Sequence, residues 1–409
     1  MNVRSKHDDN IYFAWIASRL SAGSAAFKKL YNAFGNAEEI YKCLNYQNLN
    51  LTEKQQLSLI DKNLSSAQRS IDSALYSGFT PISYESEYYP EKLKNLSNPP
   101  PIFYTKGKIV NFDKYYCVGM VGTRNASRAA LKQASEISCN LGKKGILIIS
   151  GLALGIDTEV HLSCMENGGI TVGISGVKAG QIYPKENKNT YEMMYKKGSV
   201  ICEHSPTDNV EKSAFPIRNR IISALSDALI MVEAPEKSGA LITAEKSLSL
   251  KKKVYVPQST LQNNVGGINL LERGAEILAS EDEILNLFAS QNNREFFPVE
   301  EKENEKQATI DFLEENKVLY IDENNPKSQF ENESSNEENY KSVLSKELID
   351  GLSPNESIVY NYILNMKSVS TDQMIKDLNL TGTEAASCAS MLEIYGYIRR
   401  MPGDKWSII

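Results

Sequence analysis

The sequence has few of the residues that bind metals. Its 409 residues include six cysteines and three histidines, and no two cysteines form a C-x-x-C pair. This scarcity excludes the common zinc-binding spacings, and scattered cysteines are typical of reduced thiols in the cytosol. We therefore expect no metal site and a cytoplasmic protein.

Long apolar runs are missing as well. The longest, near Ile146 to Ile156, is interrupted by Ser150, Gly151 and Gly155, which makes it too short and too broken to span a membrane. The first ten residues contain acids and no apolar segment, so they are not typical of a secretory signal. We expect no membrane partner.

The common nucleotide-binding fingerprints are also absent. No G-x-G-x-x-G follows the first predicted strand of the central region, and no acid is placed to hold a ribose. The P-loop pattern G-x-x-x-x-G-K-[ST] does not occur either. The sequence therefore predicts neither a dinucleotide cofactor nor a P-loop NTPase, and we expect no cofactor.

The net charge of −6 is distributed unevenly. Counting Lys and Arg against Asp and Glu, residues 109–280 carry +4 and residues 291–345 carry −8. The acid is concentrated in one segment, so the rest of the chain is mildly basic. The overall charge consequently does not exclude a nucleic-acid partner.

Short apolar segments alternate with helical patterns from residue 115 to residue 256. Such alternation is typical of βαβ units, which build a parallel sheet with helices on both faces. We therefore predict an α/β fold with a Rossmann-like, doubly wound, mostly parallel sheet. The predicted strands are Tyr115–Val121, Ile146–Ile149, Ile170–Ile174, Val200–Cys202, Ala228–Val232 and Val254–Val256.

The first of these strands ends in a turn that suits an anion. The strand breaks at Gly122, Thr123 and Arg124 lie in the turn, and Ser127 can cap the following helix. Such a turn directs backbone N–H groups and the positive end of a helix dipole toward one place. The Arg124 guanidinium adds donors that fit phosphate oxygens. An ordinary strand–turn–helix connection explains this stretch alone equally well.

The turns after the other strands share the same character. Ligands of parallel sheets bind outside the carboxyl ends of the strands, so these turns are expected to converge. Glycines let the backbone approach a ligand, hydroxyls and amides form hydrogen bonds, and Lys and Arg neutralise phosphate. The further candidate residues are Ser150, Gly151, Gly155, Lys185, Asn187, Arg218, Asn219, Arg220, Ser238, Gly239 and Thr243. Tyr183 and Phe215 are candidates for base stacking.

Two acid–base readings stay open from the sequence. Asp157 and His161 are four residues apart on a predicted helix. They could form an acid–base dyad or a hydrogen-bonded pair on the helix surface. Glu233 follows a predicted strand, where it could be a catalytic carboxylate or could accept hydrogen bonds from loop N–H groups. The second reading is the better supported in both cases, and we expect no catalytic residues.

The remaining segments differ in composition. Leu352-Ser353-Pro354 precedes three predicted helices and a hairpin, the pattern of a winged helix, and the third predicted helix, Thr383–Tyr395, contains no Lys or Arg. We predict a helical domain (1–80, helix-hairpin-helix-like or SAM-like), an extended connection (81–108), a Rossmann-like domain (109–290), an acidic linker (291–345) and a winged-helix domain (346–409).

Taken in order, the motifs resemble those of the bacterial DNA-processing protein A family (DprA, also called Smf). VGTRNAS, SGLALGID followed by His161, YPKEN, CEHSP, FPIRNRIISALS, VEAPEKSGALITA and GGINLLERGA stand in the family's order. The turn Ser21-Ala22-Gly23 departs from the glycine-rich hairpin of the family. DNA contact by the N-terminal helices is therefore in doubt.

The resemblance implies a non-enzymatic protein that binds single-stranded DNA. Family members act as homodimers, protect incoming strands during natural transformation and load the RecA-type recombinase onto them. Carried over by position, Arg124 and the loops at Gly122, Gly151 and Gly155 would line the DNA pocket. Two other functions remain open: a nucleotide-cleaving phosphoribohydrolase of related fold, and a protein adaptor that acts through the winged helix.

Overall fold

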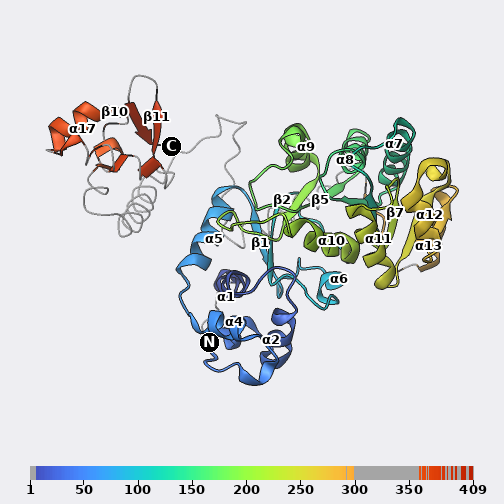
Figure 1. Ribbon diagram of the computed structural model, residues 1–409, viewed down its shortest axis with the longest axis horizontal. Helices are drawn as coiled ribbons and strands as arrows, with labels where there is room; N and C mark the ends of the chain where they lie inside the picture. The colour runs from blue at the N-terminus through green and yellow to red at the C-terminus, as the bar shows by residue number, and fades with distance from the viewer. Residues whose placement is uncertain are drawn as a thin grey trace. The chain divides into compact units, whose positions relative to one another are not determined.

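The computed structural model divides the chain into two compact units, Met1–Ile321 and Asp322–Ile409 (Figure 1). It describes residues 6–298 except 292, and in the second unit 359–360, 362–364, 366, 368–378, 380–382, 385, 388–389, 392–393, 398–401 and 405–408. Most of the predicted acidic linker lies outside these residues. The division into five segments stays a prediction.

The first unit is built on a nine-stranded sheet in the order β1-β2-β6-β5-β4-β3-β7-β8-β9. The strands from β3 to β9 pair in parallel, and β1 and β2 form an antiparallel edge beside β6. The predicted Rossmann-like, mostly parallel sheet is confirmed. The bounds are β1 Thr80–Ser83, β2 Ile102–Gly107, β3 Cys117–Val121, β4 Leu147–Ser150, β5 Thr171–Ser175, β6 Ser199–Cys202, β7 Ala228–Met231, β8 Lys253–Pro257 and β9 Glu276–Leu278.

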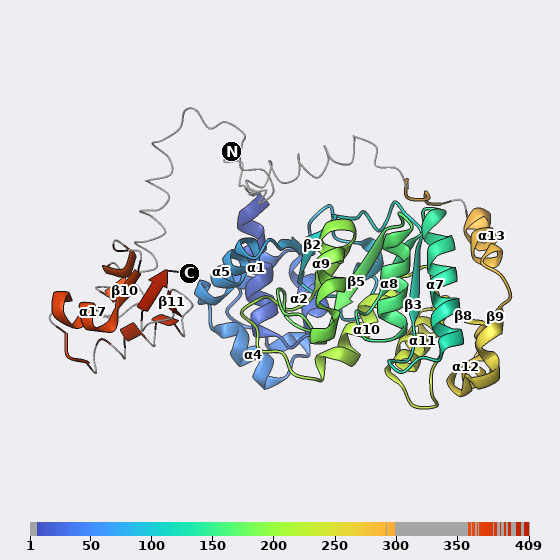
Figure 2. The ribbon, with the colours of Figure 1, turned by 90° about the horizontal axis from the view of Figure 1, so that it is seen from above.

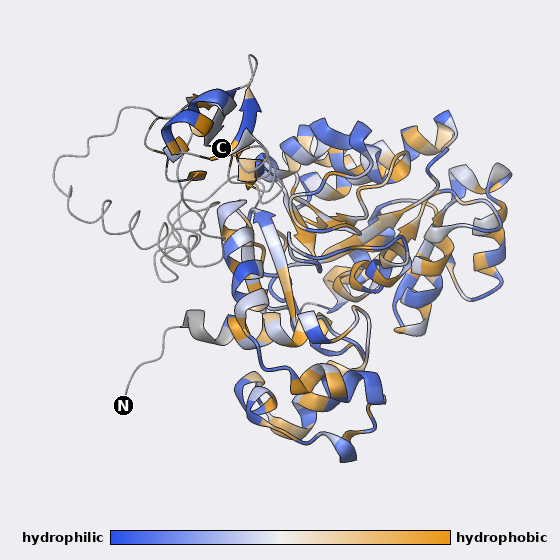
Figure 3. Ribbon diagram, turned by 60° about the vertical axis from the view of Figure 1, so that its left-hand side comes forward, coloured by the Kyte–Doolittle hydropathy of each residue, from blue (hydrophilic) through white to orange (hydrophobic). Residues whose placement is uncertain are grey.

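Helices cover both faces of this sheet (Figure 1). On one face lie α7 (Arg128–Lys143), α8 (Ile156–Glu166) and α9 (Lys188–Lys197), and Figure 2 shows α7 and α8 side by side. On the other face lie α10 (Ala214–Leu225) and α11 (Gly239–Ser249). Hydrophobic residues are concentrated along the strands and on the helix sides that face them (Figure 3). The strands from β3 to β7 are thus buried on both faces, as is typical of parallel sheets.

The order of the strands creates one place where connections diverge. From β3 the chain moves outward through β4, β5 and β6, and then returns to β7 on the other side of β3. Loops that leave the carboxyl ends of the strands near such a switch point surround a crevice. The sequence candidates lie on these loops, so the fold positions the site here.

A helical module, defined as residues 6–76, precedes the sheet. Its segments are α1 Lys6–Arg19, α2 Ala26–Phe34, α3 Ala37–Lys42, η1 Gln47–Leu49, α4 Glu53–Ile60 and α5 Ser65–Tyr76. Asn36 caps α3, and Thr52 and Gln55 form a capping box at the start of α4. Trp15 is fully buried, and its indole N–H donates to Asp61 O at 2.9 Å.

The helical module packs directly on the sheet domain. Asn98 Nδ2 donates to Gly23 O at 2.8 Å, and a Cβ on Gly23 would lie 2.7 Å from Ile217 Cγ2. Ser70 and Thr207 hydroxyls are 2.7 Å apart. The Ser21–Ser24 turn therefore faces the sheet domain, which supports a docking module and not an exposed DNA-binding hairpin.

The rest of the first unit closes the sheet at its ends. α6 (Glu91–Lys94) precedes β2, and η3 (Gln258–Asn263), α12 (Val265–Leu271) and α13 (Asp282–Gln291) follow β8. After α13 the chain returns to β3, where Tyr116 N donates to Glu295 O at 3.1 Å. This return covers the amino end of β3, opposite the candidate site.

In the second unit the described residues include a three-stranded antiparallel sheet, β10-β12-β11. Its elements are β10 Ser368–Ser370, α17 Thr371–Leu378, β11 Ile398–Met401 and β12 Lys405–Ile408. Val369, Met374 and Trp406 pack in a small apolar cluster. The winged-helix assignment stays a prediction, and most of the predicted helix Thr383–Tyr395 lies outside the described residues.

Candidate nucleic-acid interface

The loop after β3 is compact and ends in a capped helix. A Cβ on Gly122 would lie 2.5 Å from Ile156 Cγ1, so only glycine fits there. Thr123 N donates to Glu233 O at 2.8 Å, and Ser127 Oγ accepts from Ala130 N at 3.1 Å. The Arg124 side chain is exposed at the tip. The loop therefore presents one cation beside a helix N-terminus.

The loop after β4 packs against it. Gly155 has φ of 77°, and a Cβ there would lie 2.5 Å from Thr123 O and 2.6 Å from Arg124 O. Ile156 N donates to Thr123 O at 3.3 Å. A side chain at 155 would thus collide with rigid backbone, which explains the glycine in the motif. The starts of α7 and α8 are consequently held next to each other.

Beneath these loops lies a buried charge pair, Arg218 and Asp157. Arg218 Nη1 donates to Gly151 O at 2.5 Å and also to Ile174 O. Asp157 accepts from Ala153 N at 3.3 Å, while burial raises the pKa of its carboxyl and Arg218 opposes that shift. Ser150 is buried and donates to Met120 O at 2.6 Å. Arg218 and Ser150 are therefore near the site but engaged with backbone.

The loop after β5 is tied to the loop after β4 by Asn187. Asn187 Nδ2 donates to Leu152 O at 2.9 Å, and Thr158 Oγ1 donates to Asn187 Oδ1 at 3.1 Å. Asn187 is buried, whereas Lys185 in η2 (Lys185–Asn187) is exposed. Asn187 thus supports the loop, and Lys185 is free to meet a ligand from solvent.

The start of α11 completes the arrangement. Asn219 Nδ2 and Thr243 Oγ1 each donate to Gly239 O at 3.3 Å. Ser238 caps α11 by accepting from Leu241 N at 3.3 Å. The structure therefore brings most candidates to one edge of the sheet. We define the strand-end rim as residues 122–127, 151–155, 176–187, 215–219 and 233–239.

Arg220 does not join the strand-end rim. It forms a two-pronged ion pair with Glu203, with N–O distances of 2.6 and 2.7 Å, and Nε donates to Asn98 O at 3.1 Å. It lies two residues after Arg218, which places it roughly 200° around α10. The structure therefore does not bring Arg220 to the rim with the other candidates, because its donors are buried and paired on the other side of α10.

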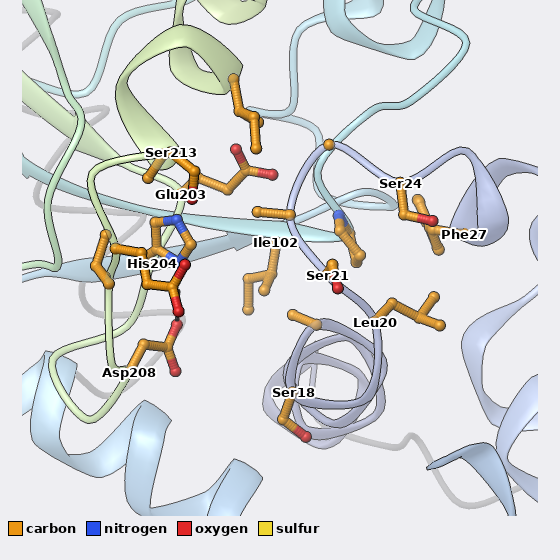
Figure 4. Close-up of a pocket in the computed structure, with 18 of the residues that line it drawn as sticks. Ser18, Leu20, Ser21, Ser24, Phe27, Ile102, Glu203, His204, Asp208 and Ser213 are labelled. Atoms are coloured by element: carbon orange, nitrogen blue, oxygen red, sulfur yellow. Dashed lines mark ion pairs between the residues drawn. The ribbon is translucent and has the colours of Figure 1, made fainter. Parts of the chain in front are cut away.

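A cavity of about 570 Å³ lies on that same side. Figure 4 shows the His204–Asp208 pair, 3.6 Å apart, facing Ser21 and Ser24 across it. Glu203 and Glu211 also line the cavity, and Lys54 lies on its wall. This mostly acidic lining is unsuited to phosphate, so we do not place the nucleic-acid site in this cavity.

The groups of both acid–base readings make structural contacts. His161 is fully buried, and its Nδ1 lies 2.7 Å from Thr171 Oγ1 and forms no hydrogen bond with Asp157. Burial lowers the pKa of His161 to about 3. The Glu233 carboxylate accepts from Ser127 N at 2.8 Å, the structural role that the sequence favoured. These groups are used within the fold.

Aromatic and basic groups extend the strand-end rim along the β5 loop. Tyr183 and Phe215 have ring centroids 5.1 Å apart, and Tyr183 is 42% exposed. Phe215 covers Gly176, whose Cβ would lie 2.5 Å from the ring. Sequence reasoning missed Lys212, which is exposed three residues before Phe215. Its position ahead of a candidate stacking residue was the available signal.

Two absences hold for the described residues only. No group of three or more His, Cys, Asp or Glu among them could hold a metal ion. Within the same part of the chain, the helices are all too short or too polar to cross a membrane.

The fold and its site define a Rossmann-like α/β protein with a glycine-bent, partly basic strand-end rim. The chain belongs to the DNA recombination-mediator protein A family, whose model matches residues 80–289.

Individual relatives support this assignment. DNA processing protein DprA of Bacillus subtilis is 36% identical over 217 residues, which are 53% of this chain and 73% of that protein. Protein Smf of Synechocystis is 37% identical over 202 residues, 48% of this chain and 51% of that protein. The X-ray structure of DNA processing protein A from Streptococcus pneumoniae aligns over 67% of this chain and 97% of that chain, with a TM-score of 0.57 and 24% identity. This last likeness shows the fold.

Proposed function

We propose that this protein binds single-stranded DNA along the strand-end rim. The observation that carries the proposal is the convergence of glycine-bent loops on one sheet edge, with Arg124 exposed among them. Helix N-termini and a guanidinium attract phosphate without reading the base sequence. Membership of a recombination-mediator family supports the same ligand.

The bases would stack beside the phosphate path. Tyr183 is exposed and is supported from behind by Phe215, with ring centroids 5.1 Å apart. Stacking on aromatic side chains accepts every base, because each base has a π face. Lys185, two residues after Tyr183, and Lys212, three residues before Phe215, are exposed and would add phosphate contacts.

The test is a salt titration of oligothymidine binding by the full chain and by Arg124→Ala. Each phosphate contact to a single strand contributes about 0.7 to the slope of log affinity against log salt. We expect Arg124→Ala to weaken binding and to flatten this slope by about that amount.

The matched control is Arg69→Ala, which removes one exposed positive charge from the helical module. It should leave the slope unchanged. Equal slopes for the full chain and Arg124→Ala would remove Arg124 from the site, and no binding by the full chain would refute the proposed function.

We infer that the protein is not an enzyme. The Glu233 carboxylate is engaged with Ser127 N, and His161 is fully buried, which supports this inference. Incubation with AMP should release no adenine. Release of adenine that depends on Glu233 would favour the phosphoribohydrolase instead.

We also propose that the protein acts as a homodimer. Ile242 of α11 and Val265 and Ile268 of α12 are 47%, 52% and 46% exposed on packed neighbouring helices. Burying such a face against a second copy would remove apolar surface from water. Ile268→Arg should produce monomers in sedimentation experiments. Leu44→Arg, at an exposed position of the helical module, should leave the dimer intact.

In the cytoplasm, such a dimer would protect incoming strands and deliver them to a RecA-type recombinase during natural transformation. Membership of a recombination-mediator family supports this role. A strand-exchange assay on DNA coated with single-strand-binding protein tests it. The full chain should shorten the lag before recombinase activity, and an unchanged lag would contradict the delivery role.

A further inference from the structure

Arg218 occupies an unusual place for a residue expected to bind phosphate. Its side chain is buried between the carboxyl ends of two adjacent strands, with 7% of the residue exposed. Nη1 donates to Gly151 O, just after β4, and to Ile174 O near the end of β5. Nε donates to Asn219 Oδ1 at 3.2 Å. One guanidinium therefore joins two strand ends and its own helix.

The charge of Arg218 is compensated inside the protein. Asp157 lies next to it, because a Cβ on Gly151 would be 2.6 Å from Asp157 Oδ2 and 2.8 Å from Arg218 Nη2. A buried cation needs such a partner, since burial without one is costly. The Asp157 carboxylate attracts the guanidinium electrostatically and so offsets part of the pull of Arg218 on an anion outside.

Arg124 is the contrasting group. It is exposed at the tip of the β3 loop, and its carbonyl packs against Gly155 of the β4 loop. Arg218 bridges the ends of β4 and β5, whereas Arg124 offers its charge to solvent. Geometry and charge are thus supplied by different residues.

We propose that Arg218 is a positioning residue of the DNA site, which fixes the β4 and β5 loops and does not itself contact phosphate. This inference rests on the proposed function. It reassigns Arg218 from the ligand set expected from sequence to the support beneath it. Arg218 is long enough for its Nη1 to donate to carbonyls of both neighbouring strands, whereas the shorter side chain of Gln does not reach them.

The experiment compares Arg218→Gln with Arg220→Gln in the full chain. Both arginines are buried on α10 and both hold partners in the fold, so both variants should lose stability. Only Arg218→Gln should change the folded protein's affinity for oligothymidine, by about tenfold at every salt concentration. The slope against salt should match that of the unaltered protein.

A second variant guards against simple misfolding. Arg218→Gln leaves the Asp157 carboxylate buried without a counter-charge, and Asp157→Asn/Arg218→Gln removes that charge. The double variant should recover thermal stability but not affinity, because the bridge to Gly151 O and Ile174 O is still missing. Hydrogen exchange at the amides of 151–155 should be faster in both Arg218 variants and unchanged in Arg220→Gln.

Three outcomes would overturn the inference. One is a flatter salt slope in Arg218→Gln, which would make Arg218 a phosphate contact. Another is full affinity in the double variant, and a third is unchanged exchange in the β4 loop. If the unaltered protein fails to bind oligothymidine, the proposed function falls, while the exchange measurement still decides whether Arg218 holds the loops.

Discussion

The strand-end rim and the contact between the helical module and the sheet domain lie on opposite sides of α10. Toward the rim, Arg218 donates to backbone carbonyls, and Arg124 beyond it stays exposed. Toward the helical module, Arg220 is paired with Glu203, and both side chains are less than a tenth exposed. The rim keeps a cation for a ligand, whereas the module contact neutralises its charges.

This difference distinguishes residues that are available to bind a ligand from residues that stabilise the fold. A site for a polyanion needs exposed donors on firm supports, and the supports themselves must be neutral or internally paired. A contact between two parts of one chain has no such need. Its buried charges contribute only when each has its partner. Substitutions on the two sides of α10 should therefore affect different measurements.

The largest effect on stability is expected for Arg220→Ala. It leaves the Glu203 carboxylate, 8% exposed, without its partner, and such a loss costs about 3–5 kcal/mol. Urea unfolding measures it. The neutral pair Glu203→Gln/Arg220→Gln should lose less, and a single-variant loss below about 1 kcal/mol would contradict the assignment of this ion pair.

Acid should destabilise the layer beneath the rim through His161. Burial lowers its pKa to about 3, while the unfolded chain binds the proton near pH 6.5. Between these values only the unfolded state is protonated, so each unit of acidification costs about 1.4 kcal/mol. The free energy of unfolding of the unaltered protein, relative to that of His161→Gln, should fall as the pH is lowered from 6.5 to 4. If urea unfolding shows the same pH dependence for both proteins, His161 is not the cause of the loss of stability in acid.

Gly155→Ala tests the packing of the β3 and β4 loops. The new Cβ would meet the carbonyls of Thr123 and Arg124, at a φ of 77°, and we expect a loss of about 1–3 kcal/mol together with weaker DNA binding. Gly180→Ala is the matched control, because its φ is 82° and nothing lies within 4 Å of the added Cβ. Equal losses in thermal unfolding would show that backbone strain alone matters.

The smallest effect on stability belongs to Arg124→Ala. This exposed side chain should change the free energy of unfolding by no more than about 0.5 kcal/mol. Urea unfolding beside the salt titration would then show binding lost without loss of fold. A large destabilisation would mean that Arg124 supports the loop structurally, as Arg218 is proposed to do.

Much of the fold could be predicted because the buried strands are short apolar runs bounded by glycine and serine. Val200–Cys202 was predicted and β6 is Ser199–Cys202. The first strand was predicted to start at Tyr115, but β3 starts at Cys117. Tyr115 and Tyr116 instead contact the returning segment at Glu295. A contact between positions so far apart in the chain leaves no local pattern.

The site could be predicted only to the level of the loops. Gly122 is needed where the Ile156 side chain comes close, and Gly155 where the backbone of the β3 loop does, and their motifs signalled this. The roles of the arginines could not be read, because Arg218 and Arg220 stand in one run, FPIRNR, with equal chemistry. Lys212 was missed because it belongs to none of the motifs that follow the strands, although it stands in a polar stretch just before Phe215.

The sequence by itself determined that small-residue turns follow the strands of a parallel sheet, since apolar periodicity and turn chemistry act over a few residues. Only the tertiary structure decided which cations face solvent. That depends on what packs against each side of α10: strand ends and Asp157 at Arg218, Glu203 and Asn98 at Arg220. A guanidinium binds whatever oxygen lies nearest, and the folded chain alone brings those oxygens into place.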